Sequence, residues 1–133
     1  MHTTRQFVSV STPIPGRQSA ELLEKRQRYV PRGVGNNAPI FVKKAEGALI
    51  HDVDGNVLLN FAGAISTLNV GHCPPEVVSA IQKQAEQYIH SCFHVAMYEP
   101  YVALAEKLAE ITPGRFPKKT ILLNSGAEAV KTQ

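Results

Sequence analysis

The segment with the clearest capacity for chemistry lies near the end of the chain, where an apolar run is followed by Ser125, Gly126 and Ala127 and then by good helix formers. We expect a strand over Thr120–Asn124 that leads directly into a helix. The first backbone N–H groups of a helix lack intrahelical partners and carry partial positive charge, so they favour a bound phosphate. Glycine at 126 would let the phosphate approach the backbone closely. Ser125 and Glu128 also fit a capping box, and local spacing leaves both interpretations open.

Histidine and cysteine form two further groups with ligating chemistry: His72 with Cys73, and His90 with Cys92 and His94. Zinc sites favour paired ligands two to four residues apart on tight turns. The alternating second group would present its ligands on one face only if the segment were extended. Buried cysteines and loop histidines are the favoured interpretation, and a small metal-binding module is the weakest of three hypotheses for this chain.

The elements that must position these residues begin after residues 1–18, whose Ser, Thr and Pro content predicts a mobile arm. Ser19 is suited to cap an amphipathic helix that Pro31 ends. Asp54-Gly55-Asn56 predicts a hairpin, because glycine accepts a positive φ, and this turn explains the nearby aspartates better than acid–base chemistry does. The three expected strands are Ile40–Val42, Leu49–Val53 and Val57–Phe61.

Two more helices are expected beyond the hairpin. Residues 62–72 are small and interrupted by glycine, which indicates a loop packed closely against another element. Pro74-Pro75 introduces a helix whose apolar residues keep a period of 3.6 as far as Ile89. The next helix begins near Pro100 and ends at Thr112-Pro113-Gly114.

Composition bounds the function. The chain has 133 residues, 44% of them hydrophobic and 19% charged, which suits an ordinary globular domain. Its net charge of +3 includes 14 scattered Lys and Arg, so we expect no nucleic-acid partner. We expect no disulfide framework, secretory signal or membrane span, and therefore a reduced, cytoplasmic setting.

Several separate stretches form a series in a fixed order. They are Pro31-Arg32-Gly33-Val34-Gly35, Asp52-Val53-Asp54-Gly55-Asn56, Phe61-Ala62-Gly63-Ala64-Ile65, Leu68-Asn69-Val70-Gly71-His72, Cys92-Phe93-His94-Val95, Tyr98-Glu99-Pro100-Tyr101 and Asn124 to Val130. The series resembles the N-terminal third of class III, fold-type I aminotransferases that depend on pyridoxal phosphate, 4-aminobutyrate aminotransferases in particular. Such a series is far more specific than one glycine-containing turn.

The resemblance implies an α/β fold, the N-terminal part of a fold-type I transferase, in which a helix and a small β-hairpin unit precede helices and the first strand and helix of the large domain. It divides the chain into an arm (1–18), an N-terminal helix with a small antiparallel β unit (19–61) and the start of the cofactor-binding domain (62–133). It implies no catalytic residue within this chain, and the spacing of histidine and cysteine leaves no metal ligand among the predicted site residues. The implied site residues are Ser125, Gly126 and Ala127 for the phosphate of pyridoxal 5'-phosphate, and Ile65 and His94 for the substrate.

The implied reaction moves an amino group from an ω-amino acid such as 4-aminobutyrate to 2-oxoglutarate, giving an aldehyde and glutamate, with the cofactor ring as electron sink. Full-length relatives are expected to be homodimers or higher homo-oligomers. The family's cofactor-binding lysine, acidic pyridine partner and stacking aromatic lie farther downstream, and Lys131 follows the phosphate turn too closely to replace that lysine.

We therefore expect a truncated segment that is inactive alone and folds poorly without a partner. An alternative is a non-catalytic interaction protein that pairs with a full-length aminotransferase subunit.

Overall fold

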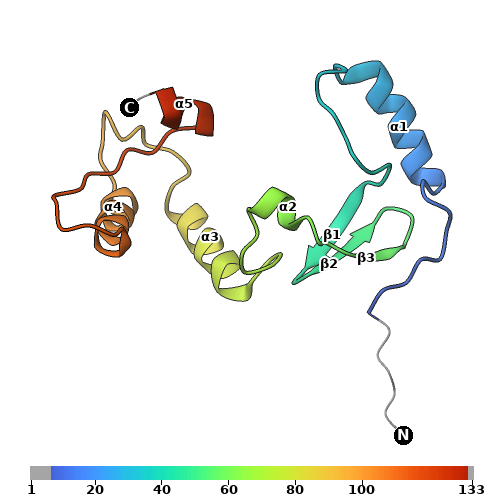
Figure 1. Cartoon of the computed structure of the whole chain (residues 1–133), viewed down its shortest axis with the longest axis horizontal. Helices are drawn as coiled ribbons and strands as arrows, with labels where there is room; N and C mark the ends of the chain where they lie inside the picture. The colour runs from blue at the N-terminus through green and yellow to red at the C-terminus, as the bar shows by residue number, and fades with distance from the viewer. Residues whose placement is uncertain (1–6, 132–133) are drawn as a thin grey trace, which may run out of the picture. The chain divides into compact units, whose positions relative to one another are not determined.

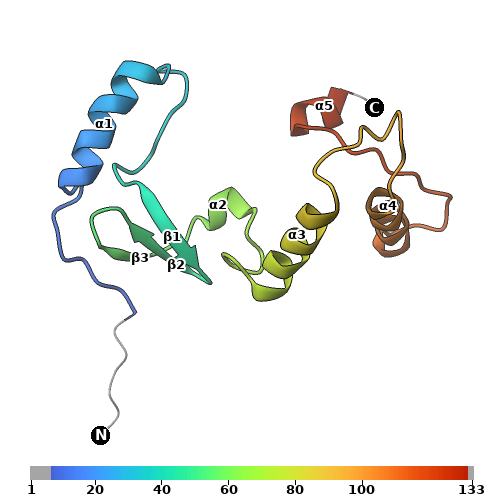
Figure 2. The same ribbon diagram turned by 180° about the vertical axis from the view of Figure 1, so that it is seen from behind.

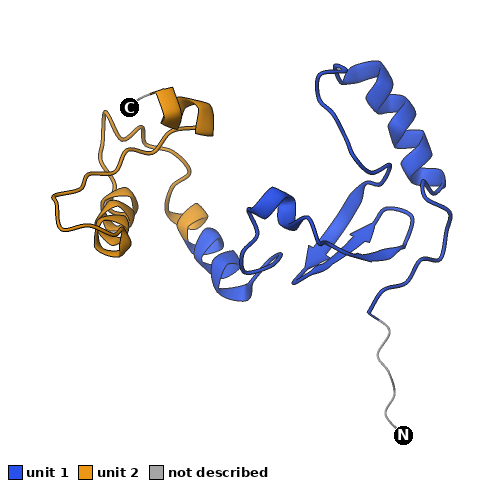
Figure 3. Cartoon of the chain, in the orientation of Figure 1, with its two compact units in different colours: residues 1–83 blue, residues 84–133 orange. Residues whose placement is uncertain are grey.

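The computed structural model describes residues 7–131, which form two compact units divided between Lys83 and Gln84 (Figure 3). Part of the predicted arm, residues 1–6, and residues 132–133 lie outside the described residues. Helices and one small antiparallel sheet give the α/β composition that the sequence predicts (Figures 1 and 2). The elements are α1 (Arg17–Tyr29), β1 (Val42–Glu46), β2 (Leu49–Asp52), β3 (Val57–Leu59), α2 (Gly63–Ser66), α3 (Pro75–Gln87), α4 (Glu99–Ile111) and α5 (Gly126–Lys131).

The sheet of the first unit is a three-stranded antiparallel meander in the order β1-β2-β3. The predicted turn between β2 and β3 is confirmed: the N–H of Asp52 donates to the carbonyl oxygen of Asn56 at 3.0 Å, and Gly55 has a φ of +90°. The first strand extends over Val42–Glu46 instead of the predicted Ile40–Val42. Pairing with β2 decides where this strand forms, and it runs from Val42 opposite Asp52 to Glu46 opposite Leu49.

The three long helices lie close to their predicted positions. Helix α1 starts at Arg17, earlier than the expected cap at Ser19, because the amides of Gln18 and Ser19 are satisfied by the carboxylate of Asp54 from the hairpin turn. Helices α3 and α4 begin at Pro75 and just before Pro100, as the proline signals indicate.

The described residues bury no hydrophobic side chain, and the side chains that they do bury are the polar ones of Ser19, Asp52 and Asn56. The predicted apolar helix faces are therefore only partly covered: on α1, Leu22 and Leu23 are half-buried, while Tyr29 is exposed. An apolar helix face or sheet face is buried only when another layer packs on it. Within residues 7–131 that layer is missing for both units.

The predicted strand over Thr120–Asn124 is wrong for the described structure, where this segment pairs with no strand. A β-strand satisfies its backbone through neighbours, and apolar sequence alone does not supply them. Leu122 instead donates its N–H to the hydroxyl oxygen of Tyr101 at 3.1 Å.

The predicted domain boundaries after residues 18 and 61 concern the division of a larger fold and stay predictions. None of the helices described for residues 7–131 combines the length and the apolar character needed to cross a bilayer.

Candidate functional site

The turn at Ser125 is a capped helix start in the second unit. The hydroxyl oxygen of Ser125 accepts the N–H of Glu128 at 3.2 Å, and the hydroxyl donates to Glu128 Oε2 at 3.1 Å. The carbonyl oxygen of Ser125 accepts the N–H of Ala129 at 3.2 Å, which closes the first turn of α5. The capping role that the sequence predicts for Ser125 is therefore confirmed, and its hydroxyl proton is engaged by the carboxylate.

The same turn leaves two backbone donors available. The N–H groups of Gly126 and Ala127 make no hydrogen bond with any other described residue, as expected for the first positions of a helix. A Cβ built on Gly126 would meet no atom within 4 Å, so the space above this backbone is open. Two exposed amide donors beside open space fit a phosphate, and the backbone, rather than the Ser125 hydroxyl, supplies the donors.

The segment before this turn is positioned by aromatic side chains of the second unit. The ring of Phe93 lies edge-on to Tyr98 and to Tyr101, with centroid distances of 5.0 and 4.6 Å. Tyr88 extends the group, 6.0 Å from Tyr98. Edge-on aromatic pairs of this kind are attractive. They hold the Tyr101 ring, whose hydroxyl accepts the N–H of Leu122 and so anchors the chain just ahead of the turn at Ser125.

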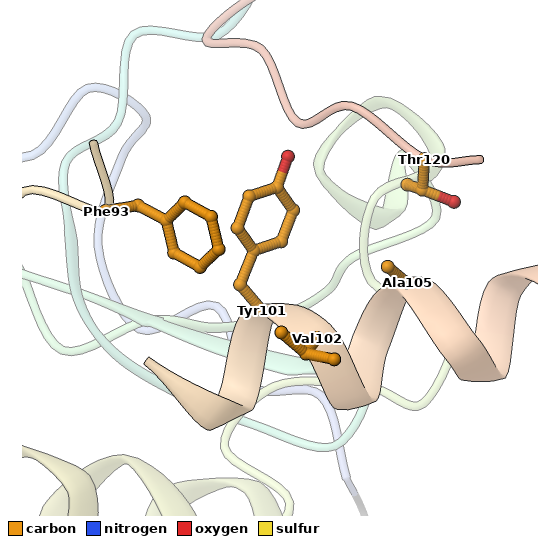
Figure 4. A pocket seen from close by; sticks show the side chains of 5 residues that line it. All are labelled: Phe93, Tyr101, Val102, Ala105 and Thr120. Atoms are coloured by element: carbon orange, nitrogen blue, oxygen red, sulfur yellow. The ribbon is translucent and has the colours of Figure 1, made fainter. Parts of the chain in front are cut away.

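An apolar cavity of about 260 Å³ opens beside this aromatic group (Figure 4). In Figure 4, the Phe93 and Tyr101 rings lie side by side, and Val102 and Ala105 belong to the adjoining turns of α4. The cavity is lined by Phe93, Tyr101, Val102, Ala105 and Thr120. Its lining offers apolar surface and ring faces but no charged group, so it suits packing against an apolar group better than acid–base chemistry.

Ile65 lies in a backbone turn of unusual conformation in the first unit. Ala64, Ile65 and Ser66 have φ angles of 49°, 56° and 63°, in the left-handed region that disfavours side chains with a Cβ, and β-branched ones most. Hydrogen bonds hold the turn: Gly63 donates its N–H to Asn60 Oδ1 at 3.1 Å, and the Thr67 hydroxyl donates to the carbonyl oxygen of Ala64 at 2.8 Å.

The turn presents the Ile65 side chain with 89% of its surface exposed. The expected close packing of residues 62–72 is thus not seen for this side chain. Three adjacent left-handed residues cost roughly 1–2 kcal/mol each, a local strain of the kind that gathers at functional sites. The predicted substrate role of Ile65 stays a prediction, and the strained, outward presentation is compatible with it.

His72 stabilises the end of the loop that contains Ile65. His72 forms a two-way backbone bridge with Gly47, with N···O distances of 2.8 and 3.0 Å. Its Nε2 lies 2.8 Å from Nδ2 of Asn60. Because an amide nitrogen can only donate, Nε2 is the acceptor and the neutral ring carries its proton on Nδ1. His72 therefore serves the loop's structure, as the loop-histidine interpretation predicts.

His94 lies in the exposed turn that joins α3 and α4. The turn contains Cys92 in the left-handed region, with a φ of 55°, and the Cys92 carbonyl oxygen accepts the N–H groups of Val95 at 2.8 Å and Ala96 at 3.0 Å. The His94 side chain is exposed. Ile65 belongs to the first unit and His94 to the second. The predicted substrate role of His94, like that of Ile65, stays a prediction.

The histidines and cysteines are also potential metal ligands. No group of three or more His, Cys, Asp or Glu side chains in residues 7–131 could hold an ion. Cys73 and Cys92 are free and exposed, which corrects the expectation of buried cysteines, because the described part of the chain has no apolar interior in which to bury them.

Asp54 and Asn56 have a larger role than the sequence analysis assigned to them. Asp54 accepts hydrogen bonds from α1, and the Ser19 hydroxyl, followed by the Gln18 and Ser19 amides, holds the pKa of its carboxyl below the ordinary value of 3.8. The hairpin signal explained the turn but gave no sign of a partner more than thirty residues away.

Comparison with known proteins identifies the family. The sequence profile described as Aminotransferase class-III matches residues 29–133. A probable 4-aminobutyrate aminotransferase from Bacillus subtilis is 51% identical over 113 residues, covering 85% of this chain and 26% of the relative. The 5-aminovalerate aminotransferase DavT from Pseudomonas aeruginosa is 49% identical over 110 residues, covering 83% of this chain and 26% of its own.

A solved structure shares the fold. The taurine:2-oxoglutarate aminotransferase from Bifidobacterium kashiwanohense, in complex with PLP and glutamate, matches 85% of this chain and 26% of its own, with 26% identity and a TM-score of 0.73. The chain belongs to the class III aminotransferase family, as the sequence resemblance implied, and this family depends on pyridoxal phosphate. It spans about a quarter of the length of these relatives.

Proposed function

We propose that this chain is the part of a pyridoxal-phosphate-dependent aminotransferase that anchors the cofactor's phosphate. The observation that carries the proposal is the pair of unengaged N–H groups at Gly126 and Ala127, beside a Ser125 hydroxyl that is already committed to the helix cap. A dianionic phosphate at this position gains two charge-assisted hydrogen bonds and the favourable end of the helix. Family membership supports the choice of pyridoxal phosphate over other phosphorylated ligands.

The division of labour follows from this placement. When bound, pyridoxal phosphate supplies an electron-accepting ring for chemistry at the amino-bearing carbon. The residues of this chain bind and orient: Gly126 and Ala127 hold the phosphate, while Tyr101 keeps the preceding segment in place through Leu122. Ile65 and His94 contact the substrate in this proposal.

The proposed substrates are an ω-amino acid of the 4-aminobutyrate or 5-aminovalerate type as amino donor and 2-oxoglutarate as acceptor. The names of the relatives support the donor class, and the name of the structural neighbour supports the acceptor. The whole protein is proposed to act in the cytoplasm as a homodimer or higher homo-oligomer.

The test uses protein expressed from its own gene, incubated with the cofactor, 4-aminobutyrate or 5-aminovalerate, and 2-oxoglutarate. We expect glutamate to form only with the phosphorylated cofactor, because pyridoxal without phosphate cannot use the Gly126 and Ala127 donors. Glutamate formation that is equally fast with pyridoxal would contradict the anchoring role. The 133 residues alone are proposed to bind phosphate without forming glutamate above the rate of cofactor in buffer, because Lys131 lies too close to the phosphate turn to reach the reacting carbon.

A second candidate function is pairing with an aminotransferase subunit without catalysis. It is favoured by the absence of any buried hydrophobic side chain among residues 7–131, since such apolar faces are stable when another chain covers them. If the protein expressed from its own gene forms no glutamate by itself in the assay above but co-elutes with a full-length aminotransferase subunit, this candidate is supported over the first.

A further inference from the structure

Three polar side chains of the first unit are the buried side chains of the described residues. Ser19, Asp52 and Asn56 are exposed by only 0%, 2% and 0%, while no hydrophobic side chain of the described residues is buried. All three lie where the chain's N-terminal segment meets the β2–β3 turn. Buried polar groups are stable only with hydrogen-bond partners, so their contacts show what holds this junction together.

Asp54 grips the start of α1. Its Oδ1 accepts the N–H of Gln18 at 2.7 Å, and its Oδ2 accepts the N–H of Ser19 at 3.1 Å and the Ser19 hydroxyl. The Gln18 side-chain amide adds a bond to the carbonyl oxygen of Val53 at 2.6 Å. The helix has no cap from its own N-cap residue, Gly16, so the hairpin turn supplies the cap from another part of the chain.

Asn56 grips the extended segment ahead of α1. Its Oδ1 accepts the N–H groups of Ser11 at 2.8 Å and Thr12 at 3.0 Å, and its Nδ2 donates to Thr12 Oγ1 at 2.8 Å. Asp52 holds the amide in this orientation, since its Oδ2 accepts the second Nδ2 proton at 2.7 Å. A two-way backbone bridge between Ser9 and Val57 continues the attachment.

Glycine at 16 makes the close approach possible. A Cβ at this position would lie 2.3 Å from Cγ of Asp54, far inside contact distance. The backbone of the segment therefore lies directly against the carboxylate, with no room for a side chain between them.

Helix α1 has no layer to pack on. Among the described residues it makes no close contact with any strand or other helix, and Figure 1 shows it meeting the hairpin only at its N-terminal end. Farther along, the Arg26 side chain bonds to the carbonyl oxygen of Val34 in the loop that follows the helix. A 13-residue helix is marginal on its own in water, so its order depends on where it is attached.

We propose that residues 9–29 form a strap that closes on the turn Asp52–Asn56 as one unit, with Asp54 and Asn56 as its latch. The hydrogen bonds that Asp54 accepts from α1 are the first grip, and those between Asn56 and residues 11 and 12 are the second. Both grips belong to one turn. Opening either grip leaves buried polar groups of that turn without partners, and the other grip depends on those groups staying in place. The strap is therefore open with α1 frayed, or closed with α1 ordered. This inference stands apart from the proposed function, because it invokes neither cofactor nor substrate.

The test measures amide hydrogen exchange in the full chain. Asp54→Ala removes the carboxylate of the first grip, and Gly16→Ala places a Cβ where that carboxylate lies. Both should speed exchange of the α1 amides about fivefold or more, the effect of losing a good helix cap. Thr12→Val keeps the side chain's shape but removes its hydroxyl from the Asn56 grip. It should speed exchange of the same α1 amides, although the hydrogen bonds of Thr12 go to Asn56 and not to α1. Glu46→Ala, which removes an exposed carboxylate of β1, is the matched control and should leave α1 unchanged.

The amides of β2 and β3 report whether the hairpin itself survives. They should keep their protection in Gly16→Ala and Thr12→Val, whose changes lie outside the turn. Normal α1 exchange in Thr12→Val together with fast exchange in Asp54→Ala would show two independent contacts and overturn the strap. Equal α1 exchange in the wild type and in all variants, whether slow or fast, would overturn the latch.

Discussion

Replacing Gly126 by valine separates phosphate binding from protein stability. A Cβ at Gly126 meets no protein atom within 4 Å and the residue does not have a positive φ, so the larger side chain finds room in the folded protein. Valine is also a slightly better helix residue than glycine, and the free energy of unfolding should change by no more than about 0.5 kcal/mol. The branched side chain instead occupies the space from which a phosphate would approach the free N–H groups.

The expected loss can be worked out from those donors. A hydrogen bond to a charged group contributes about 1.5–3 kcal/mol, so losing one corresponds to a roughly 10- to 150-fold weaker affinity. The assay is an absorbance titration with pyridoxal 5'-phosphate and, in parallel, with pyridoxal. Affinity for the phosphorylated form should fall, while affinity for pyridoxal should not.

Gly35 provides the matched control. It also has open space at its Cβ position and no positive φ, but it lies in the loop before β1. Gly35→Val should bind both ligands as the wild type does. If Gly126→Val matches Gly35→Val, or loses both ligands equally, the amides at this turn do not hold the phosphate and Ser125 is a helix cap and nothing more.

Three further outcomes are expected. The hydrogen bond from the Ser19 hydroxyl lowers the pKa of the Asp54 carboxyl below 3.8, so the stability that this cap contributes is complete above the unfolded-state pKa and is lost as pH falls through the folded-state pKa. Protection of the α1 amides should therefore be constant from pH 7 to about 5 and decline only in acid. An equal decline in Asp54→Ala would refute this. Ala64→Gly relieves a left-handed φ of 49° and should stabilise the chain by about 0.5–1 kcal/mol in urea titration, the steric gain exceeding the entropy cost of glycine; destabilisation would mean that the turn is not strained. Tyr101→Phe removes the acceptor of the Leu122 N–H and should speed exchange of that amide several-fold, in line with about 0.5–1.5 kcal/mol for one hydrogen bond; unchanged exchange would show that the contact does not order the segment.

Local sequence signals predicted most of the elements and the cap. The prolines at 75 and 100 mark the starts of α3 and α4, glycine at 55 marks the hairpin, and Ser125 with Glu128 forms the expected cap. Each of these depends on residues only a few positions apart, so a short stretch of sequence is enough to predict it. The family resemblance, which the comparisons confirm, likewise rests on residue identities in order and needs no coordinates.

Contacts between distant parts of the chain could not be obtained in this way. The strand expected at Thr120–Asn124 does not form, because a strand needs neighbours that apolar residues cannot specify by themselves. The cap of α1 by Asp54, the grip of Asn56 on Thr12 and the left-handed turn at Ile65 were likewise invisible, since propensity and periodicity describe single elements. Residue types therefore determine the long helices, the hairpin turn and the cap at Ser125. Which backbone groups find partners, and which faces remain uncovered, depends on long-range packing in three dimensions.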